Sequence, residues 1–450
     1  MRRLCEFIVH VKLVEAVLLF IACYVYPLES RDVFFLYDED IKLHRITLSG
    51  FLSKYPQAKV HTKNIERLLA DCEVDRPIVV VLGDQLLNLA KRLCRSQPIV
   101  FAHVHAPQLT NYRENKNITG IAFELSMRYF LQDLRRLIPE GSKIGFIYSS
   151  ELNHYLTTEM DFLEAEFELM GVRRRVQSRE NLGEVVKELI ENEKIKALWV
   201  MPDPLYNKAI FRKLADICMQ KKVLLVTTFE SLVKEVDAAF ALAASYFDVG
   251  VQLAEIVDKI ERGTDPQEIP LSQPKKYGTY LNPQVFQKLG IAVPLDLMNR
   301  EKVTQLVNEG QDLVNAGKAD QALDKFREAL RLDRKNSVAN YYVNLLEAQE
   351  NYRQALALLS SGNEIKAVPY LVSAASILPE ARLKLNQLRQ ELRSYSEKLY
   401  KEGIAAFHEK KYQVCIQNMN LVLMIEPNHK DAELYKEKAE KRAKAVEAIR

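Results

Sequence analysis

The chain has 450 residues, of which 48% are hydrophobic and 27% are charged. Its 63 basic and 60 acidic residues leave a formal net charge of +3, too close to balance to favour a nucleic acid or an anionic membrane surface as a partner. One hydrophobic core seldom organises so many residues, so two or three domains are expected.

The N-terminus has the layout of an export signal. Arg2 and Arg3 precede an apolar run from Leu13 to Tyr26 that only Glu15 interrupts. Residues 1–31 are therefore expected to be a signal peptide or a lipoprotein signal and anchor. The run is shorter than the ~20 apolar residues that a spanning helix needs, but an uncleaved anchor and a buried amphipathic first helix stay as alternatives.

Within this run, Phe20-Ile21-Ala22-Cys23 resembles the lipobox of bacterial lipoproteins, with phenylalanine where leucine is usual. The resemblance implies lipidation at Cys23, and a plain cleaved signal is the equal alternative. Both place the protein in the periplasm or the cell envelope, and contact with the membrane is expected only through a lipid or an N-terminal anchor.

The cysteines show no CxxC motif and no paired spacing. They stand at positions 5, 23, 72, 94, 218 and 415. Small buried apolar side chains are the favoured interpretation. A disulfide between Cys72 and Cys94 is the alternative in an oxidising compartment.

Residues 32–119 alternate short apolar runs with helical patterns. Strands are expected at 32–37, 58–63, 77–83 and 98–104, with helices leading to Tyr55 and over 64–72 and 84–94. Apolar strands separated by helices predict a parallel sheet that is covered on both faces. This stretch is expected to form lobe one.

The same alternation continues in residues 120–275, which are expected to form lobe two. Strands are expected at 143–148, 172–177, 197–202, 223–228 and 238–245, with helices at 126–138, 153–170, 182–193, 205–219 and 248–262. Right-handed crossovers predict a second doubly wound parallel sheet. Residues 276–294 are expected to return to lobe one as a strand and a short helix.

Strands vanish after Pro294, and one spacing of small and apolar residues recurs three times. It joins Gly310, Ala322 and Phe326 with Ala355, Ala367 and Leu371, and with Gly403, Cys415 and Met419. These positions resemble the tetratricopeptide pattern and predict all-α helical repeats within 295–450, at about 303–336, 348–381 and 396–429. Offsets of 45 (310 to 355) and 48 (355 to 403) residues leave room for linking helices such as 381–392. An irregular helical bundle is the alternative.

The run from Ala238 to Pro294 orders a strand, a sharp turn, a helix, a proline-bounded linker, a strand and a short helix. With the runs around residues 78–104 and 117–153, it resembles the solute-binding proteins of ABC importers, in their tryptophan-receptor-like branch. The resemblance covers roughly residues 77–294. It implies the α/β fold of a type I periplasmic binding protein, with two doubly wound parallel-sheet lobes over residues 32–294.

Ligands of doubly wound sheets bind beyond the carboxyl ends of the strands. The loops at those ends carry the candidate ligand-binding residues Gly83, Asp84, His105, Ser149, Ser150, Asn153, Asp203, Thr228, Ser245 and Tyr246. The family resemblance assigns Gly83 and Asp84 to lobe one and the seven residues from Ser149 onward to lobe two. His105 lies in a lobe-one loop that often reads serine-aspartate in the family, and so departs from the pattern. Plain helix capping is the alternative for Ser149, Ser150 and Asp203.

Asp84 departs from the family pattern, because a glycine-threonine turn usually grips a ligand carboxylate there. An ionised Asp84 would repel a carboxylate. Either the ligand presents an amine at this place, or the amino-acid specificity is lost.

The sequence gives no sign of an enzyme. The glycine spacing of nucleotide sites is missing, as are GxSxG and HExxH. We therefore expect no catalytic residues, no cofactor and no metal. His103 and His105 alternate along a strand and would suit a metal, but no third ligand is evident.

The resemblance implies an exported receptor of an ABC-type uptake system. It would bind a small metabolite, an amino acid or a related compound, by closure about hinges near 117–120, 236–239 and 277–280, and would then meet a permease. The helical repeats would bind a protein partner. The alternative is a scaffold or assembly protein of the cell envelope that keeps the fold without transport.

Overall fold

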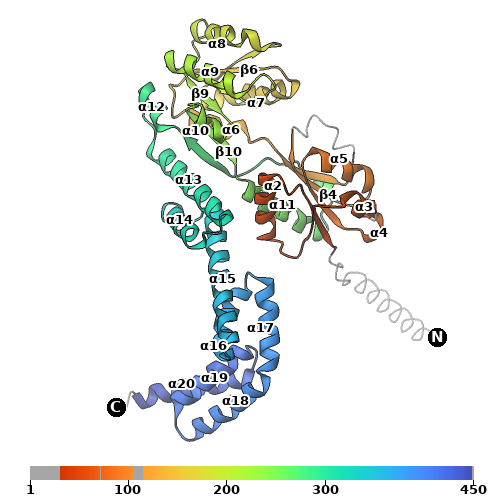
Figure 1. Cartoon of the computed structure of the whole chain (residues 1–450), viewed down its shortest axis with the longest axis vertical. Helices are drawn as coiled ribbons and strands as arrows, with labels where there is room; N and C mark the ends of the chain where they lie inside the picture. Colours follow the sequence, from red (N-terminus) through yellow and green to blue (C-terminus); the bar gives the residue numbers. More distant parts are fainter. Residues whose placement is uncertain (1–30, 71, 106–114, 448–450) are drawn as a thin grey trace, which may run out of the picture. The chain divides into compact units, whose positions relative to one another are not determined.

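A computed structural model describes residues 31–70, 72–105 and 115–447 of the chain. The expected export segment up to residue 30, with Cys23, lies outside the described residues. The chain divides into two compact units, Met1–Gln305 and Leu306–Arg450, which are taken in turn (Figure 1). Among the helices described, none is both long and apolar enough to cross a membrane.

The first lobe is built on a five-stranded sheet with the order β2-β1-β3-β4-β5, in which all pairings are parallel. Its strands are β1 (Val33–Leu36), β2 (Lys59–His61), β3 (Ile78–Leu82), β4 (Ile99–Val104) and β5 (Ile118–Ala122). Apart from the edge strand β2, every residue of these strands is buried. The continuous apolar runs thus form a sheet that is covered on both faces.

Helices cover the two faces of this first sheet differently. One face packs against α2 (Lys42–Leu52) and α11 (Tyr246–Glu261), and the other against α3 (Ile65–Ala70) and α5 (Asp84–Leu93). Side chains of neighbouring strand residues point to opposite faces of the sheet. Phe35 therefore packs in the core under α2 and α11, and Phe34 in the core under α3 and α5.

A disulfide links Cys72, at the start of the short helix α4 (Cys72–Asp75), to Cys94 after α5, with 5.6 Å between the Cα atoms. The favoured expectation, that all cysteines are buried thiols, is therefore wrong for this pair. Cys218 and Cys415 do have free and buried thiols.

The second lobe is built on a six-stranded sheet with the order β11-β10-β9-β8-β6-β7. Its strands are β6 (Lys143–Tyr148), β7 (Met170–Arg175), β8 (Ala197–Val200), β9 (Leu224–Thr227), β10 (Phe240–Ala244) and β11 (Tyr277–Leu281). Its helices are α6 (Met127–Leu134), α7 (Glu151–Phe167), α8 (Leu182–Glu191), α9 (Lys208–Gln220), α10 (Glu230–Glu235) and α12 (Pro283–Leu289). Short 3-10 helices lie at η3 (Arg179–Asn181) and, in the linker after α11, at η4 (Pro266–Glu268).

Two segments lie in the lobe opposite to the one predicted. The return segment 276–294 stays in lobe two, because β11 pairs antiparallel with β10 and Phe286 fills the core of that lobe. Helix α11, predicted in lobe two, packs on α2 and the first sheet instead. The prediction assumed parallel strands throughout. An antiparallel edge strand needs no crossover connection, so the alternation of strands and helices does not decide which lobe the last strand joins.

The chain consequently passes between the lobes at other places than predicted. It leaves lobe one after β5, returns to it between β10 and α11, and leaves again in the stretch that precedes β11. The predicted hinge at 117–120 overlaps the start of strand β5, the one at 277–280 falls inside β11, and 236–239 precedes β10 within lobe two.

Helix α13 (Leu295–Asn315) starts in the first unit and ends in the second. Its first turns are fixed to lobe two. Leu297 is buried in the core of that lobe, and Arg300 Nη2 lies 2.5 Å from the Asp133 carboxylate of α6. Thr304 Oγ1 accepts a hydrogen bond from the backbone N–H of Thr279 in β11.

The second unit consists of antiparallel helices. After α13 come α14 (Ala319–Leu332), α15 (Ser337–Ser360), α16 (Glu364–Ala375), α17 (Pro379–Glu391), α18 (Arg393–His408), α19 (Tyr412–Ile425) and α20 (Lys430–Glu447). Small residues let paired helices touch: a Cβ atom on Gly310 would lie 2.7 Å from the Phe326 ring, and one on Gly403 would lie 2.4 Å from Met419. The prediction of an all-α repeat region is confirmed, and α17 lies where a linking helix was expected.

Candidate functional site

Helices α2 and α11 cross in direct contact because each carries a glycine at the crossing. A Cβ atom on Gly50 would lie 1.8 Å from the backbone oxygen of Phe247, and one on Gly250 would lie 1.9 Å from that of Thr47. A larger residue at either position would push the helices apart. This close crossing holds Tyr246, the first residue of α11, against the carboxyl end of β4.

His103 is the residue of β4 that Tyr246 meets. The two rings stack with their centroids 5.2 Å apart and their planes at 24°. On its other side His103 Nε2 lies 2.7 Å from Thr47 Oγ1, and the His44 ring packs edge-on at 5.1 Å. The imidazole thus joins a strand of the first sheet to both α2 and α11.

The backbone at His103 adopts an uncommon conformation. Its φ is +58°, and the pairing of β4 with β5 shifts register beside it. A non-glycine residue in the left-handed region costs roughly 1–3 kcal/mol, and such residues cluster at functional sites. The irregular strand end therefore marks this edge of lobe one as a candidate binding site.

Burial keeps the rings of this cluster neutral. It lowers the pKa of His103 to about 3, and the nearby His44 and His105 lower it further. Burial also raises the pKa of Tyr246 to about 12, with a smaller contribution from the negative charge of Glu230. At neutral pH the two stacked rings therefore present an uncharged aromatic surface.

A second layer of this edge is more exposed. The His105 ring lies 4.4 Å from the Phe123 ring, and its Nδ1 lies 3.2 Å from the Glu124 carboxylate. The hydrogen bond to Glu124 raises the pKa of His105 against the effect of burial, and the charge of Asp84 adds to the rise. Asp84 is exposed in the first turn of α5, directly after Gly83 with φ +91°.

In lobe two, three of the predicted residues converge on the carboxylate of a fourth, Asp203. Asp203 accepts hydrogen bonds from the backbone N–H groups of Ser149 (2.9 Å) and Ser150 (3.3 Å), from the Ser149 hydroxyl (2.6 Å) and from Asn153 Nδ2 (2.9 Å). Burial alone would raise the pKa of Asp203, but the hydrogen bonds from Ser149, Leu205 and Asn153 outweigh it and lower this pKa. The network caps α7 and holds the loop after β6 against the loop after β8.

Thr228 and Ser245 have different surroundings. Ser245 caps α11, with its Oγ 2.5 Å from the Asp248 carboxylate, which in turn pairs with Lys276 at 3.0 Å. Thr228 follows β9, and its buried hydroxyl oxygen has no hydrogen-bond partner among the described residues.

The predicted site residues therefore form two groups. Gly83, Asp84, His105, Ser245 and Tyr246 lie on lobe one, and Ser149, Ser150, Asn153, Asp203 and Thr228 lie on lobe two. The assignment of Ser245 and Tyr246 to lobe two is corrected, because α11 packs on the first sheet.

Sequence reasoning missed most of the aromatic cluster around Tyr246. His44, Thr47, Phe123 and Glu124 were not singled out, and His103 was considered only as a metal ligand. The one signal that could have found α2 is the pair of glycines inside two helical patterns, Gly50 and Gly250, since glycine within a helix often marks a close helix contact.

The two histidines do not alternate along one strand, as the metal interpretation assumed. His105 lies beyond the end of β4, and His103 directs Nε2 at Thr47. Across residues 31–70, 72–105 and 115–447 there is no group of three or more histidine, cysteine, aspartate or glutamate side chains that could hold a metal ion.

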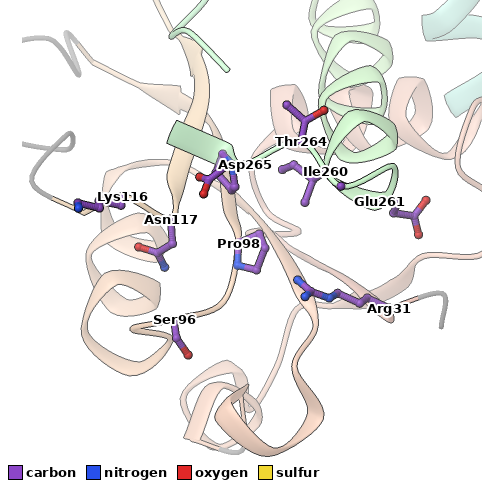
Figure 2. A pocket seen from close by; sticks show the side chains of 11 residues that line it. Arg31, Ser96, Pro98, Lys116, Asn117, Ile260, Glu261, Thr264 and Asp265 are labelled. Carbon is purple, nitrogen blue, oxygen red and sulfur yellow. The ribbon is translucent and has the colours of Figure 1, made fainter. Parts of the chain in front are cut away.

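A pocket of about 540 Å³ lies at the opposite edge of lobe one (Figure 2). Pro98 and Asn117, which directly precede β4 and β5, line it together with Glu261 and Asp265 from the end of α11 and the turn after it. The Tyr55 hydroxyl donates a hydrogen bond to Glu261. This pocket faces the amino ends of the strands and is separate from the edge that carries Tyr246.

Comparisons with known proteins agree with this architecture. A family model for ABC transporter substrate binding proteins matches residues 53–304, and a tetratricopeptide repeat model matches residues 313–376. The ligand-free, open structure of a substrate binding protein with adhesive properties from Clostridium difficile is 14% identical, covers 59% of this chain and 96% of its own, and gives a TM-score of 0.50. This likeness shows the two-lobed fold.

Two further solved structures are similar over nearly their whole length. A conserved domain protein from Vibrio cholerae is 18% identical, and the ABC domain in complex with L-Trp from Streptococcus pneumonia is 16% identical. Each covers 60% of this chain and 98% of its own, with a TM-score of 0.42. The search of curated proteins gives no match.

Proposed function

We propose, from the premise that the chain belongs to the family of ABC transporter substrate binding proteins, that it is an exported receptor for a small metabolite. Amino acids and related compounds are the first class to consider. The observation that carries the proposal is the stack of Tyr246 on His103 at the carboxyl edge of the first sheet, where ligands of such sheets bind.

The proposed site draws on the carboxyl edges of both sheets. Lobe one would contribute Gly83, Asp84, His105 and Tyr246, with Ser245 fixing the start of α11. Lobe two would contribute Thr228, whose buried hydroxyl has no partner among the described residues, and the loops that Asp203 holds. Binding would close the lobes about the three chain segments that connect them, because a ligand that touches both lobes stabilises their closed form.

Export is part of the proposal. The Cys72–Cys94 disulfide supports an oxidising compartment such as the periplasm or the outer cell envelope. The apolar N-terminal run would direct the chain there, and Cys23 would carry the lipid if the segment is a lipoprotein signal. A permease of the ABC type and a protein segment bound by the tetratricopeptide repeats are the proposed partners.

The scaffold function remains the second candidate because of the Asp203 network. The polar groups of this network already have partners within the chain. Asp203 accepts hydrogen bonds from Ser149, Ser150 and Asn153, and the Ser150 hydroxyl caps α7. The loop after β6 is therefore stable without any ligand. A cell-envelope assembly protein would need only this stable frame and the helical repeats.

A metabolite screen separates the two functions. Trp199 is the single tryptophan of the chain and lies buried in lobe two, so its fluorescence follows the unfolding of that lobe. We expect one compound class to raise the unfolding midpoint of the full chain by several degrees, since a ligand at 100 times its Kd adds about 2.7 kcal/mol. No shift with amino acids, amines, nucleosides or small organic acids would favour the scaffold.

A further inference from the structure

We infer that the ligand at the edge of lobe one is a flat, apolar molecule with a protonated amine rather than a carboxylate. This inference rests on the proposed function and names the substrate class of the same site. It comes from two independent features of the described residues, the aromatic surface around Tyr246 and the carboxylates that already lie at the helix starts.

The first feature is a run of rings that ends at the exposed rim. Tyr246 stacks on His103, and Phe123 lies 6.2 Å from Tyr246 and 4.4 Å from His105. The described residues supply no hydrogen-bond partner for the Tyr246 hydroxyl, although most of the side chain is covered. A flat ligand would extend this stack, and its polar end would meet the free hydroxyl.

The second feature is that the chain places its own carboxylates at the helix starts where a ligand carboxylate would bind. The positive end of a helix is the usual place for an anion. Asp203 accepts hydrogen bonds from the backbone N–H groups at the start of α7. Asp84 and Glu230 lie in the first turns of α5 and α10, and Asp248 lies in the first turn of α11.

The charges around the rings point the same way. The Glu124 carboxylate lies 3.2 Å from His105 Nδ1, and the negative charges of Asp84 and Glu230 are close enough to raise the pKa values of His105 and Tyr246 respectively. No lysine or arginine is present in the described loops 83–85, 103–105, 123–126 and 245–246. A protonated amine next to these rings would gain both cation–π and carboxylate contacts.

The basic residues of α2 and Lys276 before β11 lie on an exposed face or pair with other groups. Lys42 and Arg45 lie on the exposed face of α2, whereas His44 and Thr47 form its buried face. Arg45 donates to the backbone oxygen of Glu39. Lys276 pairs with Asp248. A ligand carboxylate at this site would thus be repelled by Asp84, Glu124 and Glu230.

Calorimetric titration of the full chain with three matched compounds tests the inference. Phenethylamine, phenylalanine and phenylpropionate share a phenyl ring and differ in charge. We expect phenethylamine to bind at least tenfold more tightly than phenylpropionate. Asp84→Asn should weaken phenethylamine roughly five- to tenfold and leave phenylpropionate unchanged or tighter.

Two control variants test whether the effect is specific to the charge of Asp84. Glu66→Gln removes another exposed carboxylate of lobe one, on α3, and should change neither affinity. If Asp84→Asn unfolds at a lower temperature than the wild type, Asp84→Ser is used instead to remove the same charge. Equal or tighter binding of phenylpropionate overturns the inference and leaves the receptor function intact. No binding of any of the three compounds overturns the inference alone, whereas a metabolite screen without any stabilising compound overturns the proposed function as well.

Discussion

The rings of His103 and Tyr246 stack 5.2 Å apart, although one belongs to a central strand of the first sheet and the other to a helix that enters this lobe from lobe two. Their contact depends on the glycine crossing of α2 and α11. The stack therefore fixes the segment between β10 and α11, where the chain returns to lobe one, beside the proposed ligand site.

The crossing itself can be tested by one methyl group. Gly250→Ala would place a Cβ atom 1.9 Å from the backbone oxygen of Thr47, so the helices must move apart. We expect a loss of about 3 kcal/mol in the free energy of unfolding, typical of overpacking against backbone. Circular dichroism during urea unfolding measures it.

Gly183→Ala is the matched control, because a Cβ atom there meets nothing within 4 Å on helix α8. This variant should be unchanged or more stable by up to ~1 kcal/mol. Equal effects of the two substitutions would contradict the close crossing.

The depressed pKa of His103 predicts a dependence of stability on pH. The folded pKa is about 3, below the ordinary value of 6.5, so between these values the unfolded chain binds a proton that the folded chain does not. Stability should be fully present above pH 6.5 and fall as the pH drops toward 3, by about 2 kcal/mol between pH 7.5 and 5.

The comparison of wild type with His103→Gln isolates this contribution. The lowered pKa of His44 acts in the same direction, whereas the raised pKa of His105 acts in the opposite one. Unfolding in urea at a series of pH values should show a shallower acid loss in the variant. Identical slopes would show that His103 is not held neutral by burial.

Asp203 is predicted to stabilise lobe two by joining two loops. Asp203→Ala leaves the N–H groups of Ser149, Ser150 and Leu205 without this acceptor, which should cost about 2–3 kcal/mol. Trp199 fluorescence during urea unfolding reports on this lobe. Ser178→Ala, which removes only the exposed cap of η3, should cost no more than ~1 kcal/mol.

The start of α13 provides a further contrast between a buried and an exposed ion pair. Asp133 is only 2% exposed, and burial raises its pKa despite the charge of Arg300. Arg300→Leu would leave this carboxylate without its partner and should cost about 3 kcal/mol. Arg136→Leu breaks the exposed pair with Asp296 and should cost less than ~1 kcal/mol.

Trp199 fluorescence during urea unfolding again serves as the measurement, since Asp133 lies on α6 of the same lobe. If the two arginine variants lost the same stability, the first turns of α13 would not be held by the buried pair.

Much of this fold could be predicted from the sequence, because its strands are continuous apolar runs between helices. The loops after the strands were also predictable, since the carboxyl ends of parallel strands are the usual place for ligands. The loops that carry Asp203, Ser149 and Ser150 were located in this way, whereas the hydrogen bonds that join these residues to one another were not foreseen. The repeats were visible in the spacing of Gly310, Ala355 and Gly403.

The placement of α11 and of residues 276–294 could not be predicted, because it depends on contacts between distant segments. Only the antiparallel pairing of β11 with β10 and the crossing at Gly50 and Gly250 decide it. The role of His103 was hidden for a related reason. Its contact with Tyr246 needs a shifted strand register and a positive φ, and neither leaves a mark on the local sequence pattern.

The most direct test of the central claim is a calorimetric titration of three full-length chains with the compound that most stabilises the wild type. Tyr246→Ala should weaken binding at least tenfold without unfolding lobe one, whereas Tyr370→Ala, at an exposed position of the repeats, should bind as the wild type does. Unchanged affinity of Tyr246→Ala would contradict a ligand site at the His103–Tyr246 stack.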